Sequence, residues 1–535
     1  TVIQVFRTMQ ILSWQLRDRL AFLLLVSCAG LAVMVLVAPW LVIGQPVLVF
    51  SGLLLAAVML LGRKSLRRPP ISLFLAVIAA VLALPFVVVY RAFGEVDMIS
   101  FLFHAKAGIT GVSPWMLRDE ILISLCAVIS IILISYLLSS WPKLRHLPLL
   151  TAALLVLSNP FVVFQAKLLL QPVPDVDLAA TVVTPQIAEN PLPPDIVYIY
   201  LEGLDRRFLD PDIAPETAKV LRTLEAQGLS FTDVRQVAGT GWSIAGMVAS
   251  QCGVPLLPRG YLKREVTESV ADRFLPGVTC LGDLLGGQGY RQTFVMGAEA
   301  QFAGTVAFYL THRYQKAIAQ KDMTAIFPPE ELAKASVVWF SDDQMVYDVA
   351  RMEFADALAD NRPFLLTIAT IGPHGVPNYL SRQCSSDGQA VHTKDVIEAA
   401  RCLTGMTEQL VADMQDSHRR SGRPNELRFI LQSDHLNHGH QALPDDPKLA
   451  LNLLILVGGR ERDVSVARTG TMLDVFPTVL DWLGFPVSGG KAGLGVSLLS
   501  PDAGDTLIET WDMPVLDRIV MTNMPMFEKL WEGSH

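Results

Sequence analysis

Charged residues are scarce in this chain: only 18% of its 535 residues are Asp, Glu, Lys or Arg, whereas 51% are hydrophobic. Such a composition is too apolar for a single soluble domain. The sequence also lacks any long run of lysine and arginine and any basic patch interleaved with aromatic residues, and its formal net charge is −8. These absences exclude nucleic acid as a partner.

The apolar residues are concentrated in the first third of the chain. Near-continuous apolar runs occupy residues 20–44, 46–62, 72–91, 119–140 and 147–168. Each run is long enough to cross about 30 Å of hydrocarbon at roughly 1.5 Å per helical residue. We therefore predict an N-terminal α-helical transmembrane domain of about five spans in the lipid bilayer, over residues 20–170.

Basic residues give this domain an orientation. They gather in three segments: the N-terminal stretch with Arg7, Arg17 and Arg19, the linker 63–70, and the linker 141–146. The positive-inside rule makes all three segments cytoplasmic, so five crossings leave everything after about residue 170 outside the cytoplasm. Residues 1–19 are amphipathic and carry arginine. They predict a segment in the membrane interface rather than a secretory signal peptide.

Two segments lie between the spans and the rest of the chain. Residues 91–118 leave the membrane on the outer side and carry aromatic residues together with His104 and Lys106. This mixture suits the headgroup layer, and the segment is either a simple interfacial anchor or a site for a lipid headgroup. Residues 171–195 contain several prolines and scattered acids, and they predict an extended linker.

The second half of the chain alternates strands with helices. β-branched and apolar runs predict strands at 195–201, 364–369 and 427–432. Amphipathic patterns predict helices at 216–227, 343–359, 399–416 and 472–483. We therefore predict one α/β domain over 196–510, with a central mostly parallel sheet and helices on both faces, and a C-terminal tail over 511–535.

Metal-binding residue types follow the predicted strands. Glu202 comes directly after the first strand, His374 lies a few residues after the second, and Asp434 and His435 follow the third. The carboxyl ends of parallel strands line the ligand crevice of open α/β sheets. Two carboxylates and an imidazole form a mixed oxygen and nitrogen site that suits manganese, zinc or magnesium. The alternative is an Asp-His pair that is purely structural.

Ser243 is the candidate nucleophile. It opens a run of small residues that predicts a helix, just after Gly241 and Trp242. A helix N-terminus offers unpaired N–H groups and the positive end of the helix dipole, which stabilise an alkoxide or a bound phosphate. A cation at the neighbouring strand ends would activate the hydroxyl further. The alternative is that Ser243 only caps the helix.

Four stretches carry a resemblance to known enzymes: 243–256, 280–283, 302–304 and 433–436. From about residue 196 to residue 499 the chain resembles the alkaline phosphatase and sulfatase superfamily. It is similar to the membrane-anchored branch, which contains lipoteichoic acid synthases and phosphoethanolamine transferases. Within that branch its motifs look most like those of the phosphoglycerol transferases, which decorate osmoregulated periplasmic glucans in Gram-negative bacteria.

The resemblance implies roles for the candidate residues. Glu202, Ser243, Asp434 and His435 would be the metal ligands, Ser243 would also be the nucleophile, and His374 would face the phosphoryl group and protonate the leaving oxygen. The implied metal is Mn²⁺, with Zn²⁺ or Mg²⁺ as alternatives. The implied reaction transfers phosphoglycerol from phosphatidylglycerol to a periplasmic glucan, linear or cyclic, through a phosphoglyceryl-serine intermediate, and it releases diacylglycerol. The chain would be a multi-pass protein of the inner membrane with a cytoplasmic N-terminus and a periplasmic catalytic domain.

Three other functions stay open: a phosphoethanolamine transferase acting on lipid A or a glycan, a phospholipid headgroup hydrolase, and a non-catalytic envelope protein that binds glycans. Departures from the family pattern leave the headgroup least secure. The family usually has threonine where this chain has Ser243, and serine where it has Gly203. Lipoteichoic acid synthases bind phosphoglycerol with a His and an Arg, at positions that correspond here to Met296 and Thr305.

Six residues are candidates for substrate contacts: Trp242, Glu299, His438, His440, His104 and Lys106. For His438 and His440 a second metal, the glucan acceptor and a solvated surface loop all remain possible interpretations. The pattern gives no role to His312, His392 and His418.

Cysteine usage agrees with the topology. Four of the six cysteines fall in the outer domain, and an even number in an oxidising compartment predicts two disulfides. Local pairing, Cys252 with Cys280 and Cys384 with Cys402, is the simplest of three connectivities. Cys252 is not a sulfatase nucleophile, because Cys252-Gly-Val-Pro255 has the wrong spacing for the C/S-x-P-x-R motif.

Overall fold

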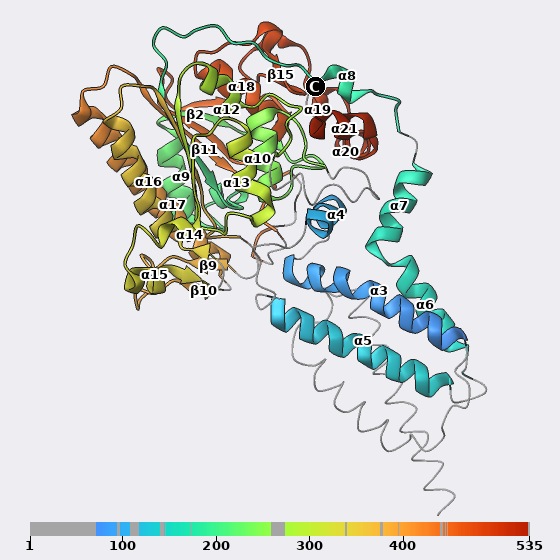
Figure 1. Cartoon of the computed structure of the whole chain (residues 1–535). Helices are drawn as coiled ribbons and strands as arrows, with labels where there is room; N and C mark the ends of the chain where they lie inside the picture. The colour runs from blue at the N-terminus through green and yellow to red at the C-terminus, as the bar shows by residue number, and fades with distance from the viewer. Residues whose placement is uncertain are drawn as a thin grey trace, which may run out of the picture. The chain divides into compact units, whose positions relative to one another are not determined.

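The computed structural model describes residues 71–93, 97–107, 117–139, 144, 146–171, 173–257, 273–337, 340–374, 378–393, 395–438, 442–444, 446 and 448–532. The chain divides into two units (Figure 1). The helical unit comprises Thr1–Met98 and Pro114–Gln171, and the α/β unit comprises Ile99–Ser113 and Pro172–His535. The predicted interfacial segment 1–19 and the predicted spans 20–44 and 46–62 lie outside the described residues.

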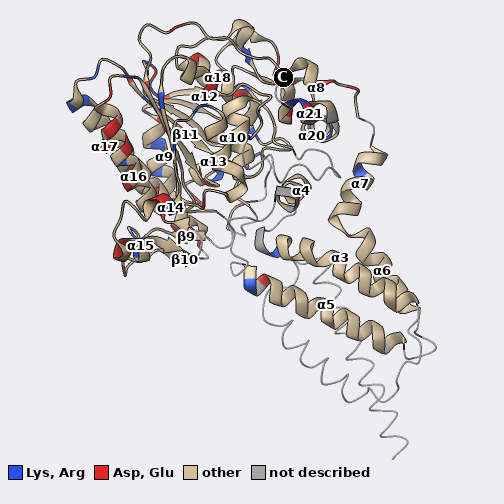
Figure 2. Cartoon of the chain, viewed as in Figure 1, with Lys and Arg blue, Asp and Glu red and all other residues tan. Residues whose placement is uncertain are grey.

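The helical unit contains four described helices: α3 (Ile71–Phe93), α5 (Arg118–Ser139), α6 (Leu147–Leu157) and α7 (Pro160–Leu170). The first three pack together through small buried residues such as Ala76, Ala80, Ala127 and Ala152. Their outer faces expose large apolar side chains, including Phe74 and Leu82. Figure 2 shows charge on α3 and α5 only near one end. Small residues between helices and large apolar residues outside are typical of helices in lipid.

The structure supports part of the predicted span pattern. In the described part of the chain, Ile71–Arg91 of α3 is long and apolar enough to cross a membrane, whereas the apolar stretch of α5, Glu120–Tyr136, is shorter. The run 147–168, predicted as one span, is divided into α6 and α7, which are bent by 61° at their junction. Pro160 has no N–H to continue α6, and the Asn159 side chain caps α7 by accepting from the Phe161 N–H at 3.0 Å.

A sheet of eight strands forms the centre of the α/β unit: β1 (Asp195–Leu201), β2 (Gly228–Phe231), β4 (Arg291–Met296), β5 (Lys316–Ile318), β8 (Phe364–Ala369), β11 (Leu427–Ser433), β12 (Leu454–Val457) and β13 (Val464–Val466). Their order is β13-β2-β12-β11-β1-β8-β4-β5. Within this sheet β12 is antiparallel to both of its neighbours, and the other pairs are parallel. The predicted mostly parallel sheet is therefore confirmed.

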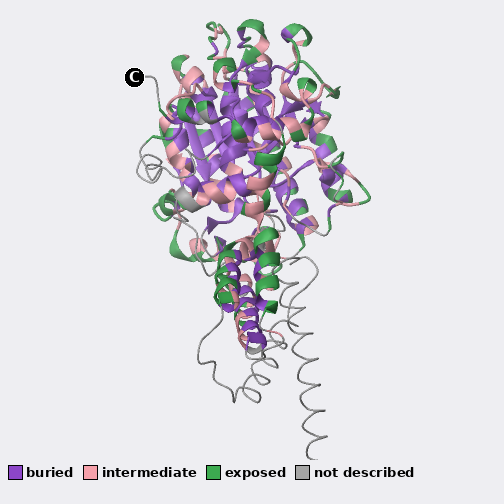
Figure 3. Cartoon of the chain, turned by 90° about the vertical axis from the view of Figure 1, so that its right-hand side faces the viewer, coloured by how far each residue is buried: buried purple, intermediate pink, exposed green. Residues whose placement is uncertain are grey.

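Helices cover both faces of this sheet (Figure 1). One face packs on α9 (Pro215–Glu225), α16 (Asp343–Leu358) and α17 (Val396–Ser421). The other face is covered by α10 (Ser243–Cys252), α12 (Leu281–Gly287), α13 (Thr305–Thr311) and α18 (Val475–Trp482). In β1 the residues Val197 and Ile199 join the first core, whereas Tyr200 on the opposite face hydrogen-bonds Ser250 of α10 at 2.8 Å. Figure 3 shows the continuous buried interior that results.

The segments expected to be a linker and a tail are packed on the α/β unit. The short helix α8 (Leu178–Thr181) buries Leu178, and Val183 pairs with Gly493. At the C-terminus, α20 (Met513–Thr522) and α21 (Met524–Trp531) follow, and Lys529 donates to the Ala179 carbonyl at 2.7 Å. The stretch 171–195, predicted from its prolines and acids to be an extended linker, therefore includes residues that pack on the α/β unit.

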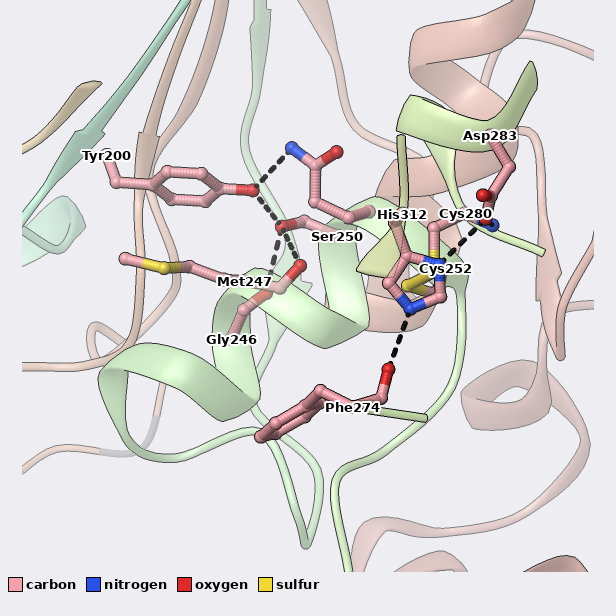
Figure 4. The surroundings of a disulfide bond; sticks show 10 residues. Tyr200, Gly246, Met247, Ser250, Cys252, Phe274, Cys280, Asp283 and His312 are labelled. Atoms are coloured by element: carbon pink, nitrogen blue, oxygen red, sulfur yellow. Dashed lines mark hydrogen bonds and ion pairs between the residues drawn. A yellow bond between two sulfur atoms is a disulfide. The ribbon is translucent and has the colours of Figure 1, made fainter. Parts of the chain in front are cut away.

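Two disulfides cross-link the α/β unit, with the local pairing predicted from the sequence. Cys252–Cys280 joins the end of α10 to the start of α12, and Cys384–Cys402 joins a loop to α17. Figure 4 shows the first bond beside α10. Because Cys252 is bonded to Cys280, it is not available as a nucleophile.

Removing the Cys252–Cys280 bond is expected to destabilise the α/β unit. The cysteines are separated by 28 positions, and the chain-entropy relation gives about 3–4 kcal/mol for a loop of that length. Both side chains are buried, so alanine at both positions is the appropriate replacement. The thermal unfolding midpoint of the double variant should fall clearly below that of the wild-type protein. An unchanged midpoint would show that the bond contributes no net stability.

Candidate active site

The candidate site lies where three neighbouring parallel strands end. β1 pairs with β11 so that Leu201 lies opposite Ser433, and it pairs with β8 on its other side. The residues that follow, Glu202 after β1 and Asp434 after β11, are therefore brought together across the two strand ends. His435 follows Asp434, and all three side chains are buried.

Ser243 reaches the same point from α10. Its Oγ lies 3.2 Å from Glu202 Oε2 and 3.5 Å from His435 Nε2. His435 Nε2 lies 3.1 Å from Glu202 Oε1 and 3.4 Å from Asp434 Oδ2. Four residues from three separate parts of the sequence thus share one small cluster. We call Glu202, Ser243, Asp434 and His435 the four-residue cluster.

The structure does not support the alternative that Ser243 is only a helix cap. The N-cap position of α10 is Trp242, whose side chain makes no capping bond, and Ser243 is the first residue of the helix. The Ser243 hydroxyl faces the carboxylate and imidazole of the cluster instead of the helix backbone. The hydroxyl therefore lies at the helix N-terminus and faces the other residues of the cluster.

Gly246 permits this close approach of α10. A Cβ atom at Gly246 would lie 1.6 Å from the backbone oxygen of Asp434, which no side chain can accommodate. The helix can therefore contact the strand end that carries Asp434 only with glycine at this position. Gly203 has a comparable role, since its φ of +56° is left-handed and a Cβ there would meet the Pro373 oxygen at 2.8 Å.

The donor set fits a divalent cation. Asp434 Oδ1 accepts the backbone N–H groups of Gly203 and His435, both at 2.9 Å. Its Oδ2 is buried and has no hydrogen-bond partner among the described residues. Glu202, Asp434 and His435 each offer a ligand atom, and these atoms lie within 4.8 Å of one another. A buried carboxylate oxygen directed at a second carboxylate and an imidazole is the arrangement that a bound cation stabilises.

The pKa shifts in the four-residue cluster also fit a bound cation. Burial and the neighbouring Asp434 raise the pKa of Glu202 to about 8. Burial alone would lower the pKa of His435, but the carboxylates of Asp434 and Glu202 raise it to about 10. Without a cation the cluster therefore retains protons, which a bound cation would displace.

His374 and His438 lie beside the cluster. Burial, together with the nearby His435 and His438, lowers the pKa of His374 to about 4. The His438 ring stacks on that of His435, with centroids 4.5 Å apart. A neutral imidazole at His374 can donate a hydrogen bond through its N–H, and the protonation of the leaving oxygen by His374 stays a prediction.

Sequence patterns missed a buried network that fixes the strand-end loops. The Asn437 side chain donates to the Gly203 oxygen at 3.1 Å and to the Pro373 oxygen at 2.7 Å. Its backbone N–H donates to Asp205, which also holds Arg207 in a buried ion pair. The loop after β11 is thereby joined to the loops after β1 and β8. Partners that are 64 to 234 positions apart leave no local signal in the sequence.

Asp343, the first residue of α16, was also missed. Its carboxylate accepts the backbone N–H groups of Ile371 and Gly372 at 2.8 and 2.9 Å, and so holds the loop that leads to His374. Burial raises the pKa of Asp343 to about 7, although the two N–H bonds act in the opposite direction. Asp343 is therefore a positioning residue for His374.

Asp343→Asn is expected to gain stability relative to the wild-type protein as the pH rises from about 4 to about 7. A carboxyl group whose pKa is raised on folding stabilises the fold below its unfolded pKa, and this stabilisation is lost as the pH passes through the folded value. The pKa of Asp343 in the folded protein is about 7. Thermal midpoints of the two proteins across this range test the sign. A wild-type advantage that grows with pH would show that the carboxylate is the favoured form.

The remaining candidates for substrate contacts differ in how they relate to the four-residue cluster. Trp242 precedes Ser243, and its ring lies 6.5 Å from that of His104 on α4 (Met98–Ala107). Lys106 is on the same helix, but its side chain falls outside the described part of the chain, as does His440. Glu299 is exposed, and no described contact joins its side chain to the four-residue cluster.

A second group of metal-ligand types, Cys280, Asp283 and His312, is structural. Cys280 is already bonded to Cys252. His312 bridges Asp283 at 2.7 Å and the Phe274 carbonyl at 3.1 Å, as Figure 4 shows. The imidazole, for which the sequence suggested no partner, thus ties α13 to α12 beside the disulfide. His418 similarly binds Asp195 at 3.0 Å.

This fold and cluster define the class of the protein. The sulfatase family model matches residues 194–485, more than half of the chain, and the chain belongs to the sulfatase family. Among curated proteins it is similar to phosphoglycerol transferase I of Xanthomonas euvesicatoria pv. vesicatoria, with 32% identity over 345 residues, 61% of this chain and 46% of the relative. The corresponding protein of Escherichia coli O6:K15:H31 is 29% identical over 313 residues, 57% of this chain and 39% of the relative. The chain thus spans less than half the length of these relatives.

Solved structures with a related architecture include two that differ in coverage. An alkaline phosphatase superfamily protein of Vibrio parahaemolyticus has a TM-score of 0.47 and 18% identity, covering 70% of this chain and 98% of that one. The lipooligosaccharide phosphoethanolamine transferase A of Neisseria meningitidis, an integral membrane protein, has a TM-score of 0.45 and 14% identity, covering 86% of this chain and 94% of that one.

Proposed function

We propose that this chain is a metal-dependent phosphoglycerol transferase of the Gram-negative inner membrane. It moves phosphoglycerol from phosphatidylglycerol to a periplasmic glucan and releases diacylglycerol. The observation that carries the proposal is the Ser243 hydroxyl at 3.2 Å from Glu202 Oε2 and 3.5 Å from His435 Nε2. The similarity to phosphoglycerol transferase I supports the choice of transferred group.

Glu202, Ser243, Asp434 and His435 would hold the cation, for which Mn²⁺ is our choice and Zn²⁺ or Mg²⁺ the alternatives. When bound, the cation supplies charge neutralisation for the serine oxygen and the phosphoryl group. Ser243 lies at the N-terminus of α10, where the helix dipole favours a developing negative charge. The protein thus provides a nucleophile in a site suited to anions.

Two displacements at phosphorus complete the transfer. The Ser243 oxygen attacks the phosphorus of phosphatidylglycerol, its proton is lost, and the bond to the diacylglycerol oxygen breaks. The departing oxygen takes up a proton, and phosphoglycerol remains as an ester of Ser243. A glucan hydroxyl then attacks the same phosphorus, loses its proton and regenerates Ser243. Throughout, the neutral His374 ring is suited to donate an N–H to a phosphoryl oxygen.

The proposed location follows from the helical unit and the disulfides. The apolar helix α3 supports a membrane position, since Ile71–Arg91 is long enough to span a bilayer. Two disulfides in the α/β unit are typical of an oxidising compartment such as the periplasm. We therefore propose a cytoplasmic N-terminus and a periplasmic α/β unit, as the basic segments predict.

Incubation of the full-length protein with phosphatidylglycerol labelled in its headgroup, Mn²⁺ and periplasmic glucan tests the proposal. We expect labelled glucan and free diacylglycerol in equal amounts. A parallel reaction with labelled phosphatidylethanolamine identifies an ethanolamine transferase, and label release that does not depend on glucan identifies a hydrolase. Glycan binding without any reaction in a protein shown to contain metal would contradict all three activities.

A further inference from the structure

The residue before the nucleophile carries a polar group with no partner among the described residues. Trp242 is 7% exposed, and its indole Nε1 is buried without a hydrogen-bond acceptor. A buried N–H that makes no hydrogen bond is costly, and such groups are uncommon in folded proteins. Trp242 is also the residue that immediately precedes α10 and Ser243. An acceptor supplied by a bound substrate would therefore satisfy it.

The Trp242 ring is held by a helix from a distant part of the sequence. Phe103 of α4 is 1% exposed, and its ring centroid lies 5.9 Å from that of Trp242. The ring centroids of Phe103 and Phe274 are 6.4 Å apart, and those of Phe274 and Trp531 of α21 are 5.2 Å apart. The indole ring is thus anchored to an aromatic cluster that extends to the C-terminus of the described chain.

His104 completes the surroundings of the indole. Its ring lies edge-on to Trp242, with centroids 6.5 Å apart and an interplanar angle of 63°. Burial lowers the pKa of His104 to about 4, so the ring is neutral near pH 7. Among the described rings that contact the indole, His104 is the titratable one and adds no full charge, which supports an uncharged N–H as the recognition group.

From this arrangement we propose that the Trp242 indole N–H donates a hydrogen bond to a headgroup oxygen of the phosphodiester that Ser243 attacks. In this role α4 keeps the indole in place through Phe103 and His104. The ligand class is a phosphate ester, and the oxygen belongs either to the phosphoryl group or to the glycerol. This inference rests on the proposed function for the identity of the donor, but the hydrogen bond itself can be measured without turnover.

Indole resonances of the full-length protein, labelled with ¹⁵N-tryptophan and loaded with Mg²⁺, report on the bond directly. Trp242→Phe identifies the Trp242 signal among the nine tryptophans. Addition of glycerol phosphate is expected to shift that signal downfield. If inorganic phosphate produces the same shift, the acceptor is a phosphoryl oxygen, and if only glycerol phosphate does so, it is a glycerol hydroxyl. A Trp242 signal that moves with neither ligand overturns the inference.

Trp482 provides a matched control. It is also 7% exposed with a buried Nε1 that has no described acceptor, but it lies on α18 beneath the Arg428 guanidinium, 5.1 Å from its ring. Phenylalanine at either position removes the same atoms. We expect similar changes in thermal midpoint, but a decrease in kcat/KM of about 10- to 100-fold for Trp242→Phe alone, the effect of losing one hydrogen bond to a charged group. Equal kcat/KM in the two variants would contradict the role of Trp242.

The two proposals fail in different ways. If glycerol phosphate shifts the Trp242 signal but no lipid donor is consumed, the binding contact stands and the transferase proposal fails. If transfer proceeds normally in Trp242→Phe and no signal moves, the transferase proposal stands and the contact fails. Phe103→Leu tests α4 separately. It retains an apolar side chain but loses the ring contact, and it should weaken glycerol phosphate binding, whereas unchanged binding would remove α4 from the proposal.

Discussion

Alanine at Ser243 is expected to reduce transfer by on the order of 10⁴-fold or more, the loss typical of removing a catalytic nucleophile. The Oγ atom that is deleted lies 3.2 Å from Glu202 Oε2 at the N-terminus of α10, and no other hydroxyl group is described at that point. Mass spectrometry of the protein quenched after mixing with phosphatidylglycerol should show a phosphoglyceryl adduct on the wild-type peptide and none on the Ser243→Ala peptide.

Two further variants make this result specific. Ser250→Ala removes a buried hydroxyl from the same helix, where Ser250 bonds Tyr200 and the Gly246 carbonyl, and it should retain transfer. Ser243→Thr keeps the hydroxyl and adds a methyl group that stiffens χ1, so it should still form the adduct. Normal turnover by Ser243→Ala, or an adduct on another residue, would remove Ser243 from its proposed role.

The elements around Ser243 could be predicted because their signals are local. The β-branched run 195–201 matches β1 to the residue, and Glu202 follows it directly. β11 extends only one residue beyond its prediction and delivers Asp434 and His435. Since parallel strands end at one edge of a sheet, recognising the strands was enough to bring the carboxylates together.

Features that depend on distant partners could not be predicted in this way. Gly246 matters because of the Asp434 backbone, and Asp343 matters because of the loop at 371–372. The same holds for Trp242, whose ring neighbour Phe103 comes from the segment 91–118, far away in the sequence. In each case the residue type is ordinary for its position, and only the tertiary contact gives it a role.

The ends of helices were also predicted less accurately than their existence. α17 begins at Val396 rather than at the predicted 399, because the Asp395 side chain accepts the N–H groups of Ile397 and Glu398. It continues to Ser421 and ends at Gly422, which has a φ of +69°. Capping residues were present in the sequence, but the amphipathic pattern alone did not include them.

Asp434→Asn is expected to lower the affinity for Mn²⁺ by on the order of 100-fold or more, since loss of a metal's direct ligand should exceed the 10- to 100-fold cost of disturbing an outer partner. The substitution conserves shape. The amide oxygen can still accept the N–H groups of Gly203 and His435, as Asp434 Oδ1 does at 2.9 Å. The amide NH₂ then replaces Oδ2, the buried oxygen without a hydrogen-bond partner, and an NH₂ group cannot bind a cation.

In the free protein the substitution has two opposing effects: it relieves the repulsion that raises the pKa of Glu202, and it removes the attraction that raises the pKa of His435. The quantity to compare is therefore the change in unfolding midpoint that Mn²⁺ causes within each protein. Stability gained from a ligand grows with its concentration relative to Kd, by about 2.7 kcal/mol at a hundredfold excess. Saturating Mn²⁺ should therefore raise the unfolding midpoint of the wild-type protein but not of Asp434→Asn.

Asp474→Asn separates this effect from the general cost of changing a buried carboxylate. Asp474 is buried, and its carboxylate accepts the backbone N–H groups of Thr471 and Val496. Burial raises its pKa to about 6, yet it does not belong to the four-residue cluster. Asp474→Asn should keep the Mn²⁺-dependent rise in midpoint. If Asp434→Asn also kept it, the cation would not bind at the strand ends. Loss of the rise in both variants would instead show that the response reports the integrity of the fold.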